Sequence, residues 1–290
     1  MTSRPGTLYV VATPIGNLED LTFRALRVLK EVDLIAAEDT RRSIKLLNHY
    51  GVRKPLVSLR EHNEARESSR LVKKLRDGQS IALISDAGTP GIADPGARLV
   101  RLARDSEVSV VPVPGPSAIT AALSVSGIEQ TEFVFMGFPP SSGLAREKWF
   151  ERTESEPRTI VFFEAPHRLN GTVEALQQHS GLRPIIVNRE LTKIYETLVV
   201  RHSKAPADLA ALEDRGEFTL ILGPKTSTEP PELDQADVYD KFSRLTNNAG
   251  FASESAVTML AAVLGVAPRG IEKAIKKGKI LVDRSSTSSA

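Results

Sequence analysis

Several apolar runs of this 290-residue chain stop at polar or conformationally special residues. The clearest case is Ile81–Gly96, where the apolar run Ile81–Ile84 meets Ser85 and Asp86 and then a loop rich in glycine and proline. Such a run predicts a buried strand, and a Gly/Pro loop at its carboxyl end is where open α/β sheets bind ligands. Glycine lets the backbone approach a ligand, and proline limits the entropy lost on binding. We therefore expect a binding crevice here, although the same residues also suit a tight turn without a ligand.

Charged residues follow further predicted strands. The cluster Glu38–Arg42 comes directly after the apolar run Val32–Ala37, and His62 follows the next predicted strand. Charged groups at the carboxyl end of a strand lie on the crevice side of a parallel sheet, so we expect both near that loop. The cluster also has a structural explanation, because Asp39 is well suited to cap the helix that follows.

Strand and helix patterns alternate over about the first 115 to 130 residues. Alternation of this kind predicts a mostly parallel α/β domain, which we place at residues 1–130. The turn Thr13–Asn17 has one glycine where the dinucleotide-binding fingerprint needs three, so that fingerprint is excluded. The small residues of Ala118–Ser126 predict a helix that can lie close to a sheet, with free N–H groups at its start for an anion. The predicted strands are Leu8–Ala12, Val32–Ala37, Pro55–Leu59, Ile81–Ile84 and Val108–Val113.

A second α/β domain is predicted for residues 131–224, after a strand at Phe133–Pro140 that ends in two prolines. Its strands have fewer helical crossovers between them, so we expect a mixed sheet. The other predicted strands are Thr159–Phe163, Ile185–Asn188, Tyr195–Val200 and Phe218–Leu222, and a helix is predicted near 207–212.

The C-terminal part is predicted to be a polar linker at residues 225–240 followed by a helical tail at 241–290. Lys225–Asp240 has one lysine and five acidic residues, whereas Lys241–Ala290 has eight Lys/Arg and three acidic residues. Within the tail, Ser253–Leu264 and Arg269–Lys277 are predicted to be helices joined by a turn. A basic helix-turn-helix shape favours nucleic-acid binding, but it is also a common packing unit.

Bulk composition narrows the class of protein. The chain is 41% hydrophobic and 26% charged, with a net charge of +2 and no cysteine. These values are typical of globular proteins, and disulfides and thiolate metal sites are excluded. The sequence has neither the pattern of a signal peptide nor an apolar stretch of membrane-spanning length. We therefore expect a cytoplasmic protein without a membrane segment.

Seven ordered motifs, collinear from about Gly6 to Gly223, resemble the ribosomal RNA small subunit methyltransferase I family. This family is the cytidine 2′-O-methyltransferase branch of the tetrapyrrole methylase superfamily. The tail resembles the small helical C-terminal extension of the family through weaker motifs. The seven motifs are TPIGNLED (13–20), AAEDTR (36–41), EHNE (61–64), SDAGTPGIADPG (85–96), VPGPSA (113–118), FFEAPHRL (162–169) and RELTK (189–193).

The resemblance implies a two-domain class III methyltransferase fold that binds S-adenosylmethionine in the cleft between the domains, without a metal. It also implies a homodimer and, as substrate, the ribose of cytidine 1402 in the 16S rRNA of the small ribosomal subunit. A loop of backbone groups and a helix N-terminus are suited to the charged groups of such a cofactor. By motif position, the cofactor-binding residues would be Pro14, Asp86, Ala87, Gly88, Pro90, Ile92, Ser117, Ala118, Phe163 and Thr219.

The resemblance also implies an RNA-binding face and a need for a proton acceptor. A ribose 2′-hydroxyl is a poor nucleophile, so methyl transfer needs in-line placement and a base that takes the proton. The hypothetical bases are Asp39, His62 and Glu164, each of which also has a structural role available, as a helix cap, a loop-orienting group or an acceptor for N–H groups. The RNA face would hold Glu38, Arg41, Asn63, His167 and Arg168, with the two arginines suited to phosphate.

Three alternatives stay open at this point. Methylation of a tetrapyrrole is the other main chemistry of the superfamily, but its enzymes usually carry a glycine-richer first turn than TPIGN. A ligand-sensing nucleic-acid-binding protein would explain the tail and leaves the many polar strand ends unexplained. An α/β protein with well-turned loops and no ligand is the third alternative, and the seven collinear motifs argue against it.

Overall fold

The chain forms two compact units, Met1–Lys225 and Thr226–Ala290. The computed structural model describes residues 4–129, 131–179, 183–201, 215–225, 234–248, 250–264 and 268–287. The helix predicted near 207–212 lies outside these residues. Half of the linker predicted at 225–240 does too, and its last part is helical instead.

The first unit begins with a five-stranded parallel sheet in the order β3-β2-β4-β1-β5. All four strand pairings in it are parallel, which confirms the prediction for this half. The strands lie where the apolar runs predicted them: β1 (Thr7–Val11), β2 (Leu34–Ala37), β3 (Leu56–Ser58), β4 (Ile81–Ile84) and β5 (Ser109–Val113).

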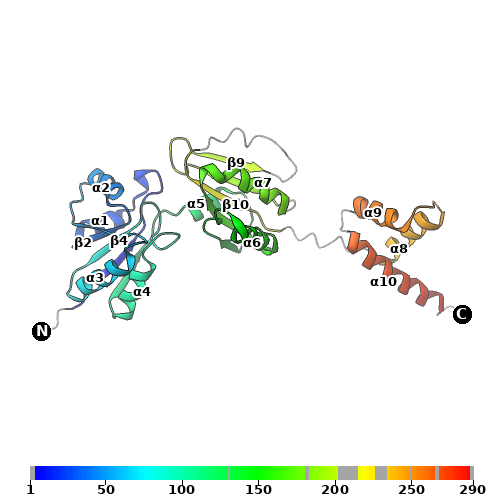
Figure 1. Ribbon diagram of the computed structural model, residues 1–290, viewed down its shortest axis with the longest axis horizontal. Coiled ribbons are helices and arrows are strands. Elements are labelled where there is room, and N and C mark those ends of the chain that lie inside the picture. The colour runs from blue at the N-terminus through cyan, green and yellow to red at the C-terminus, as the bar shows by residue number, and fades with distance from the viewer. Residues whose placement is uncertain are drawn as a thin grey trace. The chain divides into compact units, whose positions relative to one another are not determined.

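Apolar side chains cover both faces of this sheet. Alternate strand residues such as Ile35 and Ile84 pack with α1 (Phe23–Glu31) and α2 (Thr40–His49). Their neighbours, such as Leu83, pack with α3 (Glu64–Arg76) and α4 (Ala97–Asp105), which lie side by side in Figure 1. A strand buried on both faces reads as a continuous apolar run, which is why β2 and β4 were evident from the sequence.

The second sheet is mixed, as predicted, with the order β6-β7-β10-β8-β9. β6 pairs in parallel with β7, and the remaining pairs are antiparallel. One face packs against α6 (Gly143–Ser155) and α7 (Leu169–His179), with the short helix η2 (Pro166–Arg168) before α7. The strands are β6 (Phe133–Phe135), β7 (Thr159–Glu164), β8 (Ile185–Arg189), β9 (Thr197–Arg201) and β10 (Phe218–Leu222).

The opposite face of this second sheet packs against α5 (Ala118–Val125). Ile119 and Ala122 of that helix contact the core that holds Val161 and Ile221. We expected α5 to belong with residues 1–130, but its apolar residues are buried by the second sheet. The packing therefore changes from the first sheet to the second after β5, before α5 begins.

A buried arginine ties the second sheet to the end of α6. The Arg183 guanidinium donates to the carbonyl oxygens of Gly223 (2.6 Å), Thr153 (2.8 Å), Glu156 (2.9 Å) and Arg158 (2.7 Å). Arg183 is 3% exposed, and burial lowers its pKa to about 10. A charge can be buried in this way because carbonyl dipoles, some from the negative end of a helix, surround it.

The second unit is a small helical bundle with its own core of Val238, Leu260, Ile271 and neighbours. It contains α8 (Gln235–Ser243), the π-helix η4 (Arg244–Asn248), α9 (Ser253–Leu264) and α10 (Pro268–Thr287). α9 and α10 occupy the predicted helix-turn-helix, and α10 extends ten residues past the predicted end at Lys277. Four lysines of α10 are exposed: Lys273, Lys276, Lys277 and Lys279.

A glycine sets how closely α8 and α10 approach. A Cβ atom at Gly278 would lie 1.9 Å from the backbone oxygen of Gln235 and 2.7 Å from the Cβ of Tyr239. The two helices therefore cross at a distance that only glycine permits.

Candidate functional site

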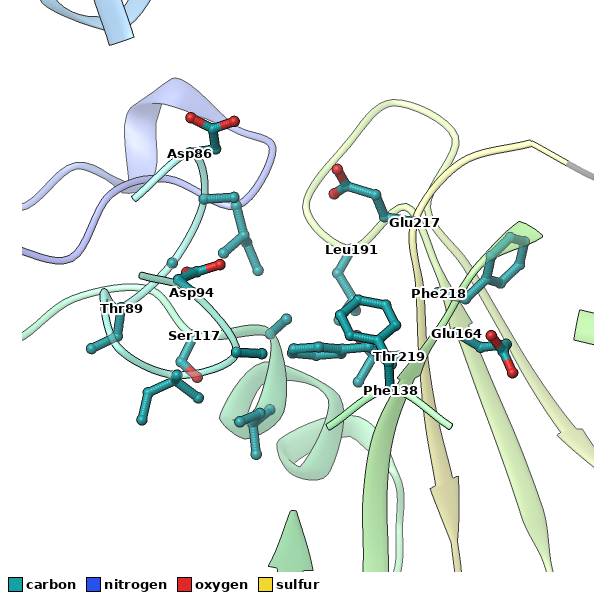
Figure 2. Close-up of a pocket in the computed structure, with 18 of the residues that line it drawn as sticks. Asp86, Thr89, Asp94, Ser117, Phe138, Glu164, Leu191, Glu217, Phe218 and Thr219 are labelled. Carbon is teal, nitrogen blue, oxygen red and sulfur yellow. The ribbon is translucent and has the colours of Figure 1, made fainter. Parts of the chain in front are cut away.

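A cavity of about 370 Å³ lies within the first unit, where its two sheets meet. Residues that follow β1, β2 and β4 and the start of α5 form one side, and β7, β10 and the residues before β10 form the other. Figure 2 shows the two sets of side chains facing each other. We call this cavity the cleft pocket. Its position at the carboxyl ends of parallel strands is the one that the sequence predicted.

The loop of residues 85–96 forms the floor of the first side. Thr13 and Gly88 exchange two backbone hydrogen bonds of 2.9 and 3.0 Å, so the loop is fastened to the turn after β1. At the loop's end, the Glu64 carboxylate accepts hydrogen bonds from the N–H groups of Gly96 and Arg98, at the start of α4. Ala93 has a φ of 61°, a left-handed conformation that costs energy for a residue with a side chain. The loop is therefore held in one strained shape from both ends.

The two sides of the cleft pocket also touch directly. The Asn17 N–H donates to the Thr192 hydroxyl at 3.1 Å. A Cβ atom at Gly16 would lie 2.4 Å from Lys193 Cγ and 2.9 Å from the Leu191 carbonyl oxygen. The motifs at residues 13–20 and 189–193 are thus in direct contact. A side chain at residue 16 would push them apart.

Most of the predicted cofactor-binding residues line the cleft pocket. Pro14 does not, although its neighbour Ile15 does, and Pro90 instead lines a separate surface groove beside α4. Phe163 and Thr219 are paired across β7 and β10 and therefore point to the same face. Those that line the pocket are Asp86, Ala87, Gly88, Ile92, Ser117, Ala118, Phe163 and Thr219.

Three carboxylates gather on the loop side of the pocket: Glu38, Asp86 and Asp94. Burial and the Asp86 charge raise the pKa of Glu38. Burial, followed by the Glu38 charge, raises the pKa of Asp94 to about 6. Asp86 forms an ion pair with Arg42 at 3.4 Å and accepts the Asp39 N–H at 3.0 Å. This side of the pocket therefore carries more negative charge than its neighbours neutralise.

Asp39 lies outside the pocket wall and is committed to other groups. It caps α2, and its carboxylate pairs with Arg41 at 2.7 Å and Arg60 at 3.2 Å. The hydrogen bond from Arg41 holds the pKa of Asp39 well below its usual range. A carboxylate with so low a pKa is a weak proton acceptor. The Arg41 side chain is 82% exposed.

His62 and Asn63 follow β3, the edge strand of the sheet, and neither lines the cleft pocket. His62 is exposed, with no side-chain hydrogen bond among the described residues. The Asn63 side chain accepts the Arg60 N–H at 2.8 Å and donates to the Ser58 carbonyl at 3.1 Å. Asn63 therefore shapes the turn after β3.

Glu164 borders the pocket, but its carboxylate points away from it, as Figure 2 shows. Successive residues of a strand point to opposite faces, so Glu164 faces α6 and α7 when Phe163 faces the pocket. Its side chain is fully buried and pairs with Arg168 at 2.6 Å, the Thr172 hydroxyl at 2.5 Å and the Ala165 N–H at 2.7 Å. Arg168 is thereby committed to Glu164, whereas His167 is exposed.

Several pocket residues were not predicted from the sequence. The most notable is Asp94 on the loop side, together with Phe138, Leu191 and Glu217 on the other. Asp94 lies within the loop that the sequence predicted as a binding site. The left-handed backbone at the preceding Ala93 could not be predicted from the sequence. Phe138 is 54% exposed, so its ring is accessible to a ligand in the pocket.

Two other features bear on the class of protein. Among the described residues, no cluster of three or more His, Cys, Asp or Glu side chains is arranged to hold a metal ion. Within the same part of the chain, no helix is both long and apolar enough to span a membrane.

Comparisons with known proteins agree with this architecture. A crystal structure of diphthine synthase superposes with a TM-score of 0.61 at 14% identity, covering 75% of this chain and 90% of that one, which supports the fold alone. A relative from Pseudomonas aeruginosa named ribosomal RNA small subunit methyltransferase I is 46% identical over 75% of this chain and 78% of its own. A relative of the same name from Halalkalibacterium halodurans is 43% identical over 92% of this chain and 93% of its own.

The match to a family description covers most of the chain. The model of the tetrapyrrole (corrin/porphyrin) methylases matches residues 7–233, which span both sheets and the cleft pocket. The resemblance drawn from the seven motifs is thereby confirmed. The chain belongs to the tetrapyrrole methylase family and, within it, to the ribosomal RNA small subunit methyltransferase I family.

Proposed function

We propose that this protein uses S-adenosylmethionine to methylate the ribose 2′-hydroxyl of a cytidine in the RNA of the small ribosomal subunit. The observation that carries the proposal is the cleft pocket, a cavity with an acidic wall at the strand ends of a chain whose relatives are named as rRNA methyltransferases. The RNA substrate is inferred from the names of the relatives. The ribose 2′-position and the cytidine are inferred from the family resemblance.

The lining residues fit this cofactor. The pocket volume of about 370 Å³ falls in the range of small-molecule sites. Glu38 and Asp94 offer negative charge to a sulfonium or an ammonium group, and Ile92 offers apolar surface to the adenine. At the start of α5, Ser117 makes no side-chain capping bond, so the first N–H groups of this helix are available to a carboxylate. When bound, the cofactor supplies an electrophilic methyl group.

The chain's own residues would then position the ribose and accept its proton. In-line placement of the 2′-oxygen is expected to supply most of the rate. Of the base candidates, Asp39 is held as an ion by two arginines and Glu164 faces away from the pocket. His62 is the one whose side chain has no partner in the described part of the chain. His62 also lies outside the pocket, so we propose it as a base only if the bound RNA brings the 2′-hydroxyl to the turn after β3. Single-turnover transfer with the His62→Ala variant tests this role, and an unchanged rate would exclude it.

The RNA contacts are proposed from exposure. Arg41 and His167 present exposed side chains that can reach phosphate or base groups. Arg168 and Asn63 would act indirectly, by holding Glu164 and the turn after β3. Glu38 lines the pocket and would lie nearer the methyl group than the RNA backbone.

The test is methyl transfer from labelled S-adenosylmethionine to purified small ribosomal subunits. We expect label on one cytidine ribose, which can be located because a methylated 2′-oxygen makes the adjoining phosphodiester resistant to alkali. Label on a base would contradict the ribose assignment. Absence of label from RNA, with the cofactor bound, would favour a tetrapyrrole substrate or a sensor.

A pair of variants ties the activity to the cleft pocket. Ala118→Phe places a large ring where Ala118 lines the pocket and should abolish cofactor binding. Thr120→Phe adds the same ring at an exposed position of the same helix and should leave binding unchanged. Equal binding by both variants would place the cofactor elsewhere.

We also propose a homodimer acting in the cytoplasm, on the strength of the family resemblance. Analytical ultracentrifugation at micromolar concentration tests the dimer, and a sedimenting species with the mass of one chain would contradict it. Cell fractionation tests the location.

A further inference from the structure

One carboxylate of the cleft pocket has no cationic partner. Asp94 forms no ion pair among the described residues, whereas Asp86 pairs with Arg42. In Figure 2 the Asp94 carboxylate extends from the loop toward the space in front of Leu191 and Phe138, on the other side of the pocket. A partly buried acid without a counter-charge is costly, so this position calls for a cation that the chain itself does not supply.

The opposite wall is suited to the same cation. Phe138 and Phe163 lie with their ring centroids 5.4 Å apart, and both line the pocket. The faces of aromatic rings carry negative potential and attract cations. A positive group between Asp94 and these rings would be attracted from both sides.

Other charges around the pocket do not replace that cation. Glu38 at the end of β2 and Asp86 at the end of β4 add negative charge. Arg42 of α2 is engaged with Asp86, and Glu217 on the far side is paired with Lys193 at 3.2 Å. Asp94 and Glu38 are thus the pocket carboxylates that have no ion pair within the described residues.

We propose that Asp94 is the counter-ion that the pocket offers to the positively charged sulfur of the cofactor. The inference rests on the proposed function and goes beyond it, because it assigns one side chain to one group. Asp94 would attract the sulfonium but not the neutral thioether that remains after methyl transfer. The side chain would therefore distinguish cofactor from product.

Protonation of Asp94 gives this idea a measurable consequence. Burial and the Glu38 and Asp86 charges raise its pKa to about 6, while a hydrogen bond from Ser85 opposes them. A cation binds the ionised form, so its affinity falls as the pH drops through this value. Between pH 7 and pH 5 the ionised fraction falls about tenfold, and affinity should fall equally.

The experiment is calorimetric titration of the full chain with S-adenosylmethionine and with S-adenosylhomocysteine at pH 7 and pH 5. For the parent protein, we expect about tenfold weaker binding of the sulfonium ligand at pH 5 and a change below about twofold for the thioether. Asp94→Asn should bind the sulfonium ligand about tenfold more weakly at pH 7 and lose the pH effect. Asp105→Asn, an exposed acid on α4, removes the same charge away from the pocket and should behave like the parent.

Each other outcome is decisive. Equal pH responses for the two ligands would overturn the assignment to sulfur, since both ligands carry the same ammonium group. An unchanged pH response in Asp94→Asn would overturn the role of Asp94. If the parent protein bound neither ligand, the proposed function itself would fail and this inference with it. Thermal melts establish that the variant is folded, and the comparison in the parent protein needs no variant.

Discussion

Replacing Glu164 by Gln tests whether this residue positions the pocket wall or takes a proton. The substitution keeps the shape of the side chain and removes its charge. Arg168 would then keep a guanidinium that is only 19% exposed without its partner at 2.6 Å. Breaking one side of a buried pair costs about 3 to 5 kcal/mol, and the partial exposure of Arg168 argues for the lower end.

A loss of about 3 kcal/mol lowers the melting temperature of a unit this size by about 6 to 12 °C. Differential scanning calorimetry measures this shift. The matched control is Glu156→Gln, whose partner Arg158 lies at the same 2.6 Å but is 45% exposed. A surface pair contributes little to stability, so this control should melt within about 3 °C of the parent.

The double variant Glu164→Gln/Arg168→Met removes the orphaned charge and should recover part of the stability, because the two residues act as a pair. If the double variant lost as much stability as the two single variants together, the two residues would not act as a pair. A Glu164→Gln protein as stable as the parent, but without single-turnover methyl transfer, would refute the positioning role and make Glu164 a base.

Four further outcomes follow from the packing and charges. Gly278→Ala should increase hydrogen exchange across α8 and α10, because its Cβ would meet a backbone oxygen at 1.9 Å, whereas Gly270→Ala has nothing within 4 Å and should not. Arg183→Met should cost about 3 to 5 kcal/mol in chemical denaturation, because it strands buried carbonyl groups; a smaller loss would mean that water replaces the guanidinium. Asp94→Asn should raise the free energy of unfolding by about 1 to 3 kcal/mol at pH 7.5 but not at pH 4. A carboxyl group with a raised pKa stabilises the fold at low pH, and this contribution is lost as the pH rises through about 6. Deleting residues 235–290 should weaken RNA binding and leave cofactor affinity unchanged. The salt dependence should become flatter, by about 0.7 to 0.9 in slope for each phosphate that the tail no longer neutralises. An unchanged salt slope would exclude the exposed lysines of α10 from RNA binding.

The strands and helices could be predicted because buried segments have a characteristic local pattern of apolar residues. β2 and β4 are covered on both faces and therefore read as unbroken apolar runs. Element ends were less evident, since α10 extends to Thr287, past the predicted Lys277. Ile271, Ala274 and Ile275 pack the predicted part of this helix into the bundle core. The assignment of α5 failed for a related reason, since its small apolar residues suit either sheet and only the packing chose the second.

The candidate site, too, has features that could be predicted from the sequence and features that could not. Turn residues and motifs are properties of short segments, so the loop 85–96, the family and the strand ends that form the cleft pocket could all be predicted from local patterns. Which polar side chains share that pocket became evident from the folded chain alone. Strand order left His62 at the sheet edge, strand alternation turned Glu164 away, and the backbone at Ala93 brought Asp94 beside Glu38. Side-chain direction and proximity between distant segments depend on register and packing, which no short stretch of sequence contains.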